Sequence, residues 1–122
     1  MPGDGYFFQP TVLAGTGPGM AAFGEETFGA LAALTVAHDD EDAARLADAI
    51  AFGLGLSVWT ADAARGVGLA RRITSGAAFV NAVVASDPSL PFGGIRRSGY
   101  GRELAAASIR ELTNTRTYWV AA

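Results

Sequence analysis

Short apolar runs alternate with helix-forming segments along the middle of the chain, and this alternation restricts the folds that the sequence can adopt. Residues 28–36, 56–60 and 78–84 have the length and composition of strands. Residues 39–50 and 63–73 lie between them and carry the spacing and the end signals of helices. Strands that alternate with helices of about a dozen residues indicate βαβ units and a mostly parallel, buried sheet. The sequence therefore predicts an α/β fold.

The segment at residues 39–50 has the clearest helical pattern. One face of this helix would carry Ala43, Leu46, Ala47 and Ile50. Residues 39–42 are all acidic. A run of acids can bind a metal ion, but acids at a helix N-terminus more often complement the helix dipole and stay solvated. His38 is the only histidine, which excludes a histidine-based centre. We expect no metal site here.

The two ends of the chain are less regular than its middle. Residues 6–13, which include a proline, predict an irregular edge strand, and residues 20–26 predict one helical turn. Residues 85–101 contain prolines and glycines that leave no room for regular structure, so a long loop is expected there. After it, residues 103–112 predict a helix, and residues 113–120 predict a final strand with an exposed edge that can pair with another chain. No linker between domains interrupts the sequence, so we expect the chain to form a single structural unit.

The composition narrows the classes of partner. Half of the 122 residues are hydrophobic, which allows a folded core. The net charge of −3 argues against binding to nucleic acid or to anionic membranes, because both need clustered cations. The chain has no apolar run of membrane-spanning length and does not begin like a signal peptide, which is typical of a cytoplasmic protein. A small molecule or another protein is the expected partner.

Two stretches have the composition of functional motifs. The sequence EETFG contains Glu26 and Phe28, where a short helix is expected to meet a strand; on residue chemistry alone it indicates a solvated acid pair and a core phenylalanine. Residues 91–103, PFGGIRRSGYGRE, contain glycines that imply positive φ or close approach of backbones. The residues alone favour a structural loop over a binding loop, and they leave open an anion site at Arg96 and Arg97.

Taken in order, these and other stretches resemble the C-terminal part of aldehyde dehydrogenases. The resemblance is carried by GYFFQPTVL, EETFG, FGLGLSVWT, FVN, SDPSLPFGGIRRSGYGREL and NTRTYWV, which together cover nearly the whole chain. The version SDPSLPFGG looks like that of succinate-semialdehyde dehydrogenases. The resemblance implies an α/β fold that is the C-terminal portion of the catalytic domain in residues 1–112, followed by an oligomerisation strand in residues 113–122.

The resemblance also implies roles for four residues. Glu26 would accept hydrogen bonds from the ribose of NAD or NADP, and Phe28 would be a flat apolar wall for the nicotinamide. Phe92 would line the aldehyde tunnel, and Ser86 would help arginines from elsewhere in the enzyme to hold the distal carboxylate of succinate semialdehyde. Three residues depart from the family pattern: Ala30 replaces a proline, Arg96 replaces a lysine, and Ser108 stands where glycine is common.

The family's reaction uses a cysteine thiolate and a glutamate base, both of which precede the GYF segment in family members. This chain contains no cysteine. We therefore expect a fragment of an NAD(P)-dependent aldehyde dehydrogenase, acting on succinate semialdehyde, that is inactive alone and either forms homo-oligomers or associates with aldehyde dehydrogenase chains. The alternative is a non-catalytic assembly module that associates with a full-length aldehyde dehydrogenase.

Overall fold

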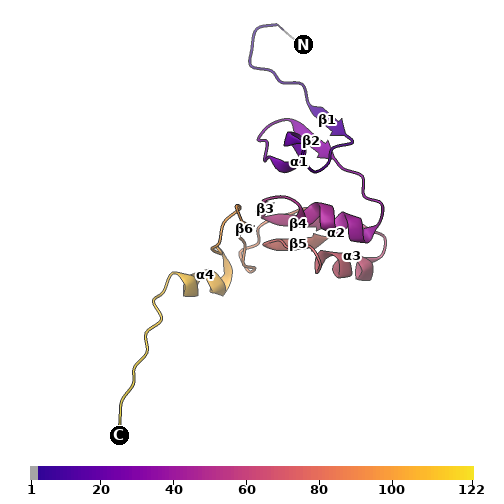
Figure 1. Cartoon of the computed structure of the whole chain (residues 1–122). Coiled ribbons are helices and arrows are strands. Elements are labelled where there is room, and N and C mark those ends of the chain that lie inside the picture. The colour runs from indigo at the N-terminus through magenta and orange to yellow at the C-terminus, as the bar shows by residue number, and fades with distance from the viewer. Residues whose placement is uncertain (1–2) are drawn as a thin grey trace. The chain divides into compact units, whose positions relative to one another are not determined.

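The computed structural model of the chain describes residues 3–122, and these residues form two compact units (Figure 1). The first unit ends at Ala51 and the second begins at Phe52. The sequence contains no glycine-rich, proline-rich or polar linker at this boundary, and a single piece was expected. Each unit is built around one parallel pair of strands that a helix connects. The predicted βαβ unit of residues 56–60, 63–73 and 78–84 is confirmed, whereas residues 28–36 pair with the strand before them and not with residues 56–60.

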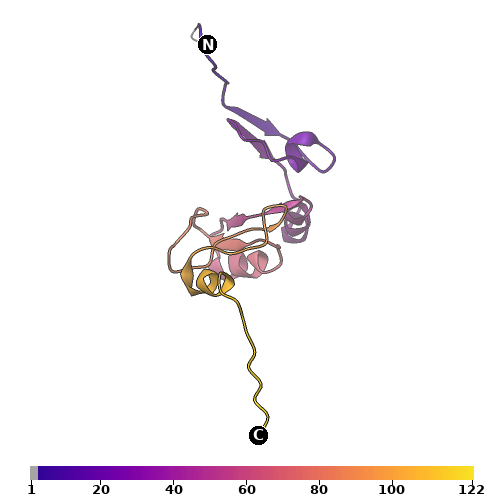
Figure 2. The same ribbon diagram turned by 90° about the vertical axis from the view of Figure 1, so that its left-hand side faces the viewer.

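In the first unit, strands β1 (Thr11–Ala14) and β2 (Leu31–Leu34) run parallel and are joined through the short helix α1 (Ala21–Gly24). Figure 2 shows the two strands side by side with α1 beside them. The pairing continues past β1, because the Thr16 N–H donates to the Leu34 carbonyl at 3.1 Å. The hydroxyls of Thr16 and Thr35 lie 2.9 Å apart, so the buried Thr16 side chain has a hydrogen-bond partner.

Helix α2 (Asp40–Asp48) follows β2 and confirms the predicted amphipathic helix. It begins after Asp39, whose carboxylate accepts from the Asp42 N–H at 2.8 Å and so caps the helix. Its predicted apolar face lines an open pocket of about 340 Å³ together with α1 and β2. The lining residues are Ala22, Phe23, Ala33, Thr35, Ala37, Ala43, Leu46, Ala47 and Ile50.

In the second unit, strands β4 (Gly55–Val58) and β5 (Ala77–Val80) run parallel and are joined through helix α3 (Ala63–Ala70). Asp62 caps α3 by accepting from the Arg65 N–H at 3.0 Å. A second, antiparallel pair consists of β3 (Phe52–Gly53) and β6 (Ile95–Arg96). Helix α4 (Ala105–Glu111) ends the regular structure, as residues 103–112 predicted.

Three expectations about strands need correction. The single, mostly parallel sheet is replaced by three two-stranded sheets among the described residues, one of them antiparallel. Residues 6–10 take no strand; β1 begins only after Pro10, which has no N–H to donate to a ladder. Residues 114–122 are exposed and form no strand within this chain, because a strand needs a partner backbone and no other described segment pairs with them.

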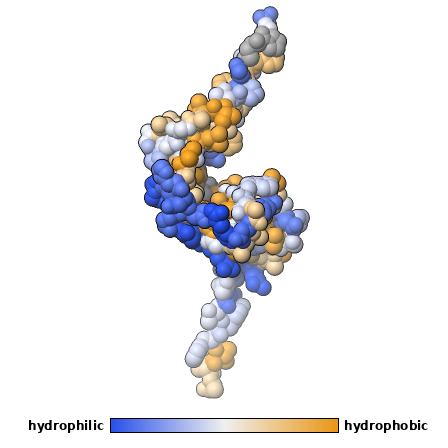
Figure 3. Space-filling view, turned by 90° about the vertical axis from the view of Figure 1, so that its right-hand side faces the viewer, coloured by the Kyte–Doolittle hydropathy of each residue, from blue (hydrophilic) through white to orange (hydrophobic). Residues whose placement is uncertain are grey.

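Little apolar surface is buried in either unit. Among the described residues, the buried hydrophobic side chains are Ala44, Leu46 and Val58. Figure 3 shows hydrophobic residues gathered on the surface of the first unit. No helix in the described part of the chain has the length and hydrophobicity needed to cross a membrane.

Candidate functional site

The segment between α1 and β2 carries the two residues that were predicted to contact a cofactor. Helix α1 ends where the Glu25 N–H donates to the Ala21 carbonyl at 2.8 Å. At the other end, the Ala30 carbonyl accepts from the Thr11 N–H at 2.9 Å, so the segment is tied to β1. Glu26 is exposed and Phe28 is 93 % exposed. The interpretation of Phe28 as a core residue is therefore wrong for this chain, and its ring face is accessible.

The segment after β5 carries Ser86 and begins the predicted substrate loop. Ser86 is exposed. The next residue, Asp87, accepts from both the backbone N–H and the hydroxyl of Ser89, at 2.8 and 2.6 Å. These two bonds, the hydroxyl bond first, hold the pKa of the Asp87 carboxyl below its usual value. The negative charge of Asp87, the residue after Ser86, is therefore hydrogen-bonded within the turn of residues 87–89.

The loop from Phe92 to Gly101 is closely packed against its own backbone. Gly93 lies beside the Gly101 carbonyl and Gly94 beside the Ser98 carbonyl, so closely that a Cβ at either glycine would collide with a backbone atom. The loop bounds an open pocket of about 410 Å³. The lining residues are Leu54, Phe92, Gly93, Gly94, Ser98, Gly99, Tyr100, Gly101, Arg102 and Glu103. Phe92 is half-buried in this wall.

Contacts with β3 fix the tip of the same loop. The Ser98 hydroxyl oxygen accepts from the Gly53 N–H at 3.0 Å. The guanidinium of Arg97 lies over the Phe52 ring, 5.1 Å from its centroid, which is a cation–π distance. Arg97 therefore has a structural contact in this chain, which weakens the interpretation of this segment as an anion site.

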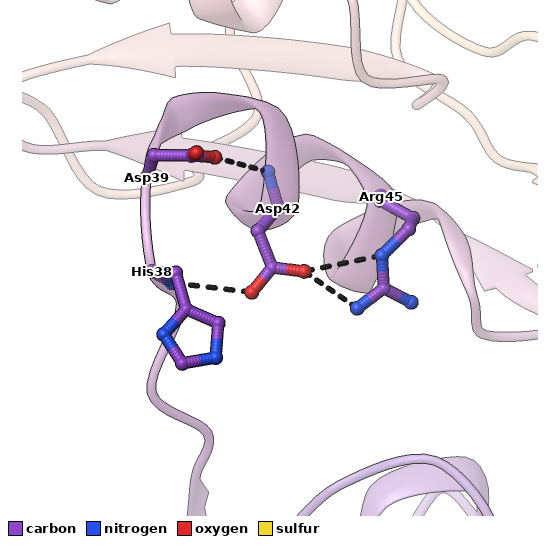
Figure 4. A network of polar contacts seen from close by, with 4 residues as sticks. All are labelled: His38, Asp39, Asp42 and Arg45. Carbon is purple, nitrogen blue, oxygen red and sulfur yellow. Dashed lines mark hydrogen bonds and ion pairs between the residues drawn. The ribbon is translucent and has the colours of Figure 1, made fainter.

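The acidic start of α2 is a capping and ion-pair network (Figure 4). Asp42 accepts from the His38 N–H at 3.1 Å, and the Arg45 guanidinium lies 2.5 Å from the other carboxylate oxygen. The hydrogen bond from Arg45, followed by the one from His38, holds the pKa of the Asp42 carboxyl below its usual value. Within residues 3–122, no group of three or more acids, histidines or cysteines is arranged to hold a metal ion.

The four predicted site residues form two pairs. Glu26 and Phe28 stand on one segment of the first unit, and Ser86 and Phe92 stand on one segment of the second. Reasoning from the sequence missed Arg102, whose guanidinium bonds carbonyls within the glycine loop. No signal in the sequence marked this role, because the partners of Arg102 are backbone carbonyls.

Comparison with known proteins decides the family. A sequence model described as the aldehyde dehydrogenase family matches residues 1–118. The chain belongs to the aldehyde dehydrogenase family. The α/β fold and the resemblance noted from the motifs are thereby confirmed.

The relatives of this aldehyde dehydrogenase chain are much longer than the chain. Succinate-semialdehyde dehydrogenase [NADP(+)] 1 of Mycobacterium ulcerans is 44 % identical over 118 residues, which are 97 % of this chain and 26 % of the relative. Succinate semialdehyde dehydrogenase [NAD(P)+] of Escherichia coli is 43 % identical over 119 residues, which are 98 % of this chain and 26 % of that relative. The chain therefore spans about a quarter of the length of these relatives.

Solved structures of family members share the fold. The crystal structure of Mycobacterium tuberculosis aldehyde dehydrogenase complexed with NAD+ matches 88 % of this chain with a TM-score of 0.82 and 37 % identity. The match covers 22 % of that protein. The two βαβ units and the glycine loop thus correspond to one part of a larger aldehyde dehydrogenase fold.

Proposed function

We propose that this chain supplies part of the cofactor wall and part of the substrate wall of an aldehyde dehydrogenase that oxidises succinate semialdehyde to the carboxylic acid with NAD or NADP. The observation that carries the proposal is the family match over residues 1–118, with succinate-semialdehyde dehydrogenases more than 40 % identical to nearly the whole chain. The exposed positions of Glu26, Phe28 and Ser86 support it, since a wall residue must present its side chain to a ligand.

The segment between α1 and β2 fits a dinucleotide. The exposed carboxylate of Glu26 can accept from two vicinal ribose hydroxyls, and the exposed ring of Phe28 offers a flat apolar face to a nicotinamide. When bound, the nicotinamide accepts the hydride that leaves the substrate. The role of this chain would be to orient the ring rather than to react with it.

The segment after β5 fits a short aldehyde that carries a distal carboxylate. Ser86 offers a hydroxyl donor. The neighbouring Asp87 carboxylate accepts two hydrogen bonds from Ser89, which lessens the repulsion between Asp87 and an anionic substrate. Phe92 supplies apolar surface next to the glycine loop. One hydroxyl cannot hold a carboxylate by itself, so cationic groups outside this chain would share the task.

The chain on its own is expected to catalyse no oxidation, because it contains no cysteine to form the thiohemiacetal with the aldehyde. The purified chain with succinate semialdehyde, and first NAD and then NADP, should give no rise in reduced-nicotinamide absorbance. Clear turnover that depends on the protein would contradict this part of the proposal.

A chimera tests the proposed wall residues directly. This chain would replace the corresponding quarter of the Escherichia coli relative, and the chimera should oxidise succinate semialdehyde. Ser86→Ala should lower kcat/KM for succinate semialdehyde about tenfold, since a hydrogen bond to a charged group is worth about 1.5–3 kcal/mol. Butanal lacks the distal carboxylate, so the same variant should leave kcat/KM for butanal unchanged. An equal loss with both aldehydes would remove Ser86 from the proposal.

The cofactor wall has its own test in the chimera. Phe28→Ala should raise the KM for NAD or NADP, whereas Phe28→Tyr, which keeps the flat ring, should not. An unchanged cofactor KM in Phe28→Ala would show that the ring does not face the nicotinamide.

A second candidate function is that of a non-catalytic assembly module. It is favoured by the exposed apolar side chains of the C-terminal segment, Tyr118, Trp119 and Val120, which match the oligomerisation strand proposed for residues 113–122. Mixing the chain with the Escherichia coli relative and sizing the mixture tests this function. Co-migration that is lost when residues 113–122 are removed would support it, and separate elution of the two proteins would exclude it for this pair.

A further inference from the structure

Arg102 lies where the glycine loop returns to its starting point. One guanidinium nitrogen, Nη1, donates to the Gly94 carbonyl at 2.7 Å and to the Gly101 carbonyl at 2.9 Å. Gly94 follows Phe92 on the outgoing side of the loop, and Gly101 is on the returning side. The arginine side chain therefore spans the loop and links its two sides, and its bond to Gly94 is partly buried.

Backbone hydrogen bonds close the loop at the same place. The Phe92 N–H donates to the Glu103 carbonyl at 2.8 Å, and the Glu103 N–H donates to the Phe92 carbonyl at 2.7 Å. Two residues later, the Ala105 N–H donates to the Pro88 carbonyl at 3.1 Å. The segment from Arg102 to Ala105 thus holds the chain on both sides of residues 89–91.

The backbone between these bonds is strained. Leu104 has φ 64° and Ala105 has φ 55°, a region that residues with a Cβ rarely adopt. Such a conformation persists only where its surroundings enforce it. The Phe92–Glu103 pair lies directly before Leu104, and Ala105 is the first residue of α4. The Glu111 carboxylate of α4 also accepts from the Arg102 N–H at 2.9 Å, which ties the segment to the helix.

We propose that Arg102 is a positioning residue that sets the place of Phe92 in the substrate wall. This inference rests on the proposed function for the substrate wall itself. Arg102 would not touch the substrate; it would act by holding the carbonyls of Gly94 and Gly101. A guanidinium is suited to this task because it stays charged and presents several donors in a rigid plane.

Amide hydrogen exchange of the 122-residue chain tests the positioning. Arg102→Met keeps much of the side-chain volume but leaves both carbonyls without their donor, and it should raise the exchange of the Phe92 and Glu103 amides about tenfold. Exchange in the β4–β5 pair should not change. Arg102→Lys keeps a charged donor and should give a smaller increase. Arg110→Met, which alters an exposed arginine of α4, is the matched control and should leave the loop unchanged.

Two exchange results would overturn the proposal. One is unchanged exchange at Phe92 and Glu103 in Arg102→Met. The other is an equal increase in Arg102→Met and Arg102→Lys that extends through β4–β5, because general destabilisation would then explain the loss.

The chimera with the Escherichia coli relative separates positioning from overall stability. Arg102→Met should raise the KM for succinate semialdehyde about tenfold and leave the KM for NAD or NADP unchanged, because the cofactor wall is on another segment. A fall in kcat alone, with both KM values unchanged, would overturn the role in the substrate wall. An inactive chimera with Arg102 intact would count against the proposed function instead, and the exchange result would still decide the positioning of the loop.

Discussion

Helix α3 contains two glycines, Gly66 and Gly68, that should respond in opposite ways to the same substitution. Gly66 is buried, and a Cβ there would lie 2.7 Å from Cγ1 of Val80 and 2.8 Å from Cγ2 of Thr60. Gly68 is exposed, and a Cβ there would have no neighbour within 4 Å. The pair isolates the packing of α3 on the parallel strands from the helix propensity of the two positions.

The expected magnitudes follow from two terms. Alanine is better than glycine in a helix interior by about 1 kcal/mol, so Gly68→Ala should stabilise α3 by about that amount. Gly66→Ala gains the same, but overpacking a filled site costs about 1–3 kcal/mol. Both neighbours of Gly66 are β-branched and turn away only at a cost. The net effect of Gly66→Ala is therefore a destabilisation of about 1 kcal/mol.

Amide exchange over α3, β4 and β5 measures both effects in the same protein. At about tenfold for every 1.4 kcal/mol, Gly68→Ala should slow exchange about fivefold and Gly66→Ala should speed it about fivefold. If both variants slow exchange, the close contact between Gly66 and Val80 does not exist in solution and the packing of this βαβ unit is wrong. If neither variant changes exchange, α3 is not a cooperative part of the unit.

Three further predictions concern other parts of the chain. The interactions that lower the pKa of Asp42 stabilise the start of α2 when pH lies above the carboxyl's ordinary pKa of 3.8, and this stabilisation should be lost as pH falls below that value. Circular dichroism should show the loss of helicity, and Asp42→Asn should remove this pH dependence. Asn81 has φ 54°, and its side chain makes hydrogen bonds of 2.8 Å with both the N–H and the carbonyl of Thr60. Asn81→Ala should therefore destabilise β4–β5 by about 2 kcal/mol, and Asn81→Gly should be less harmful because glycine adopts a positive φ readily. Equal amide exchange rates in the two variants would show that the backbone conformation does not matter. The chain alone should self-associate or aggregate at micromolar concentration, and elution as a monodisperse monomer that unfolds cooperatively would contradict this.

The helices of the fold could be predicted because their signals are local. Asp39 and Asp62 occupy the N-cap positions of α2 and α3, and each side chain accepts from the N–H three residues further on. Strands β2, β4 and β5 overlap the runs predicted for them for the same reason. The two-residue strands β3 and β6 were not predicted, and β6 lies within residues 85–101, where no regular structure was expected. The arrangement of the strands into separate pairs could not be predicted, because pairing depends on segments far apart in the sequence. Residues 113–120 show this limit, since an alternating pattern does not specify a partner.

The candidate site was located through family motifs more than through residue chemistry. Chemistry alone placed Phe28 in a core, because a phenylalanine beside a strand usually packs inside, whereas the chain exposes it. The loop from Phe92 to Gly101 was recognised as special from its glycines, and the collisions that a Cβ would cause at Gly93 and Gly94 give the physical reason. The part played by Arg102 was not visible, because its partners are backbone carbonyls, which every residue has.

The way in which the second unit is held together bears on how its loop would work. Val58 is the one large apolar side chain of that unit found buried among the described residues, so a hydrophobic core contributes little to the loop. Its geometry comes instead from local contacts: the Arg102 bonds, the Phe92–Glu103 pair, and Arg97 over Phe52. These contacts all lie within the unit. In the proposed substrate wall, a loop held by contacts of its own chain needs less ordering on binding, so more of the binding energy would be retained for selecting the aldehyde.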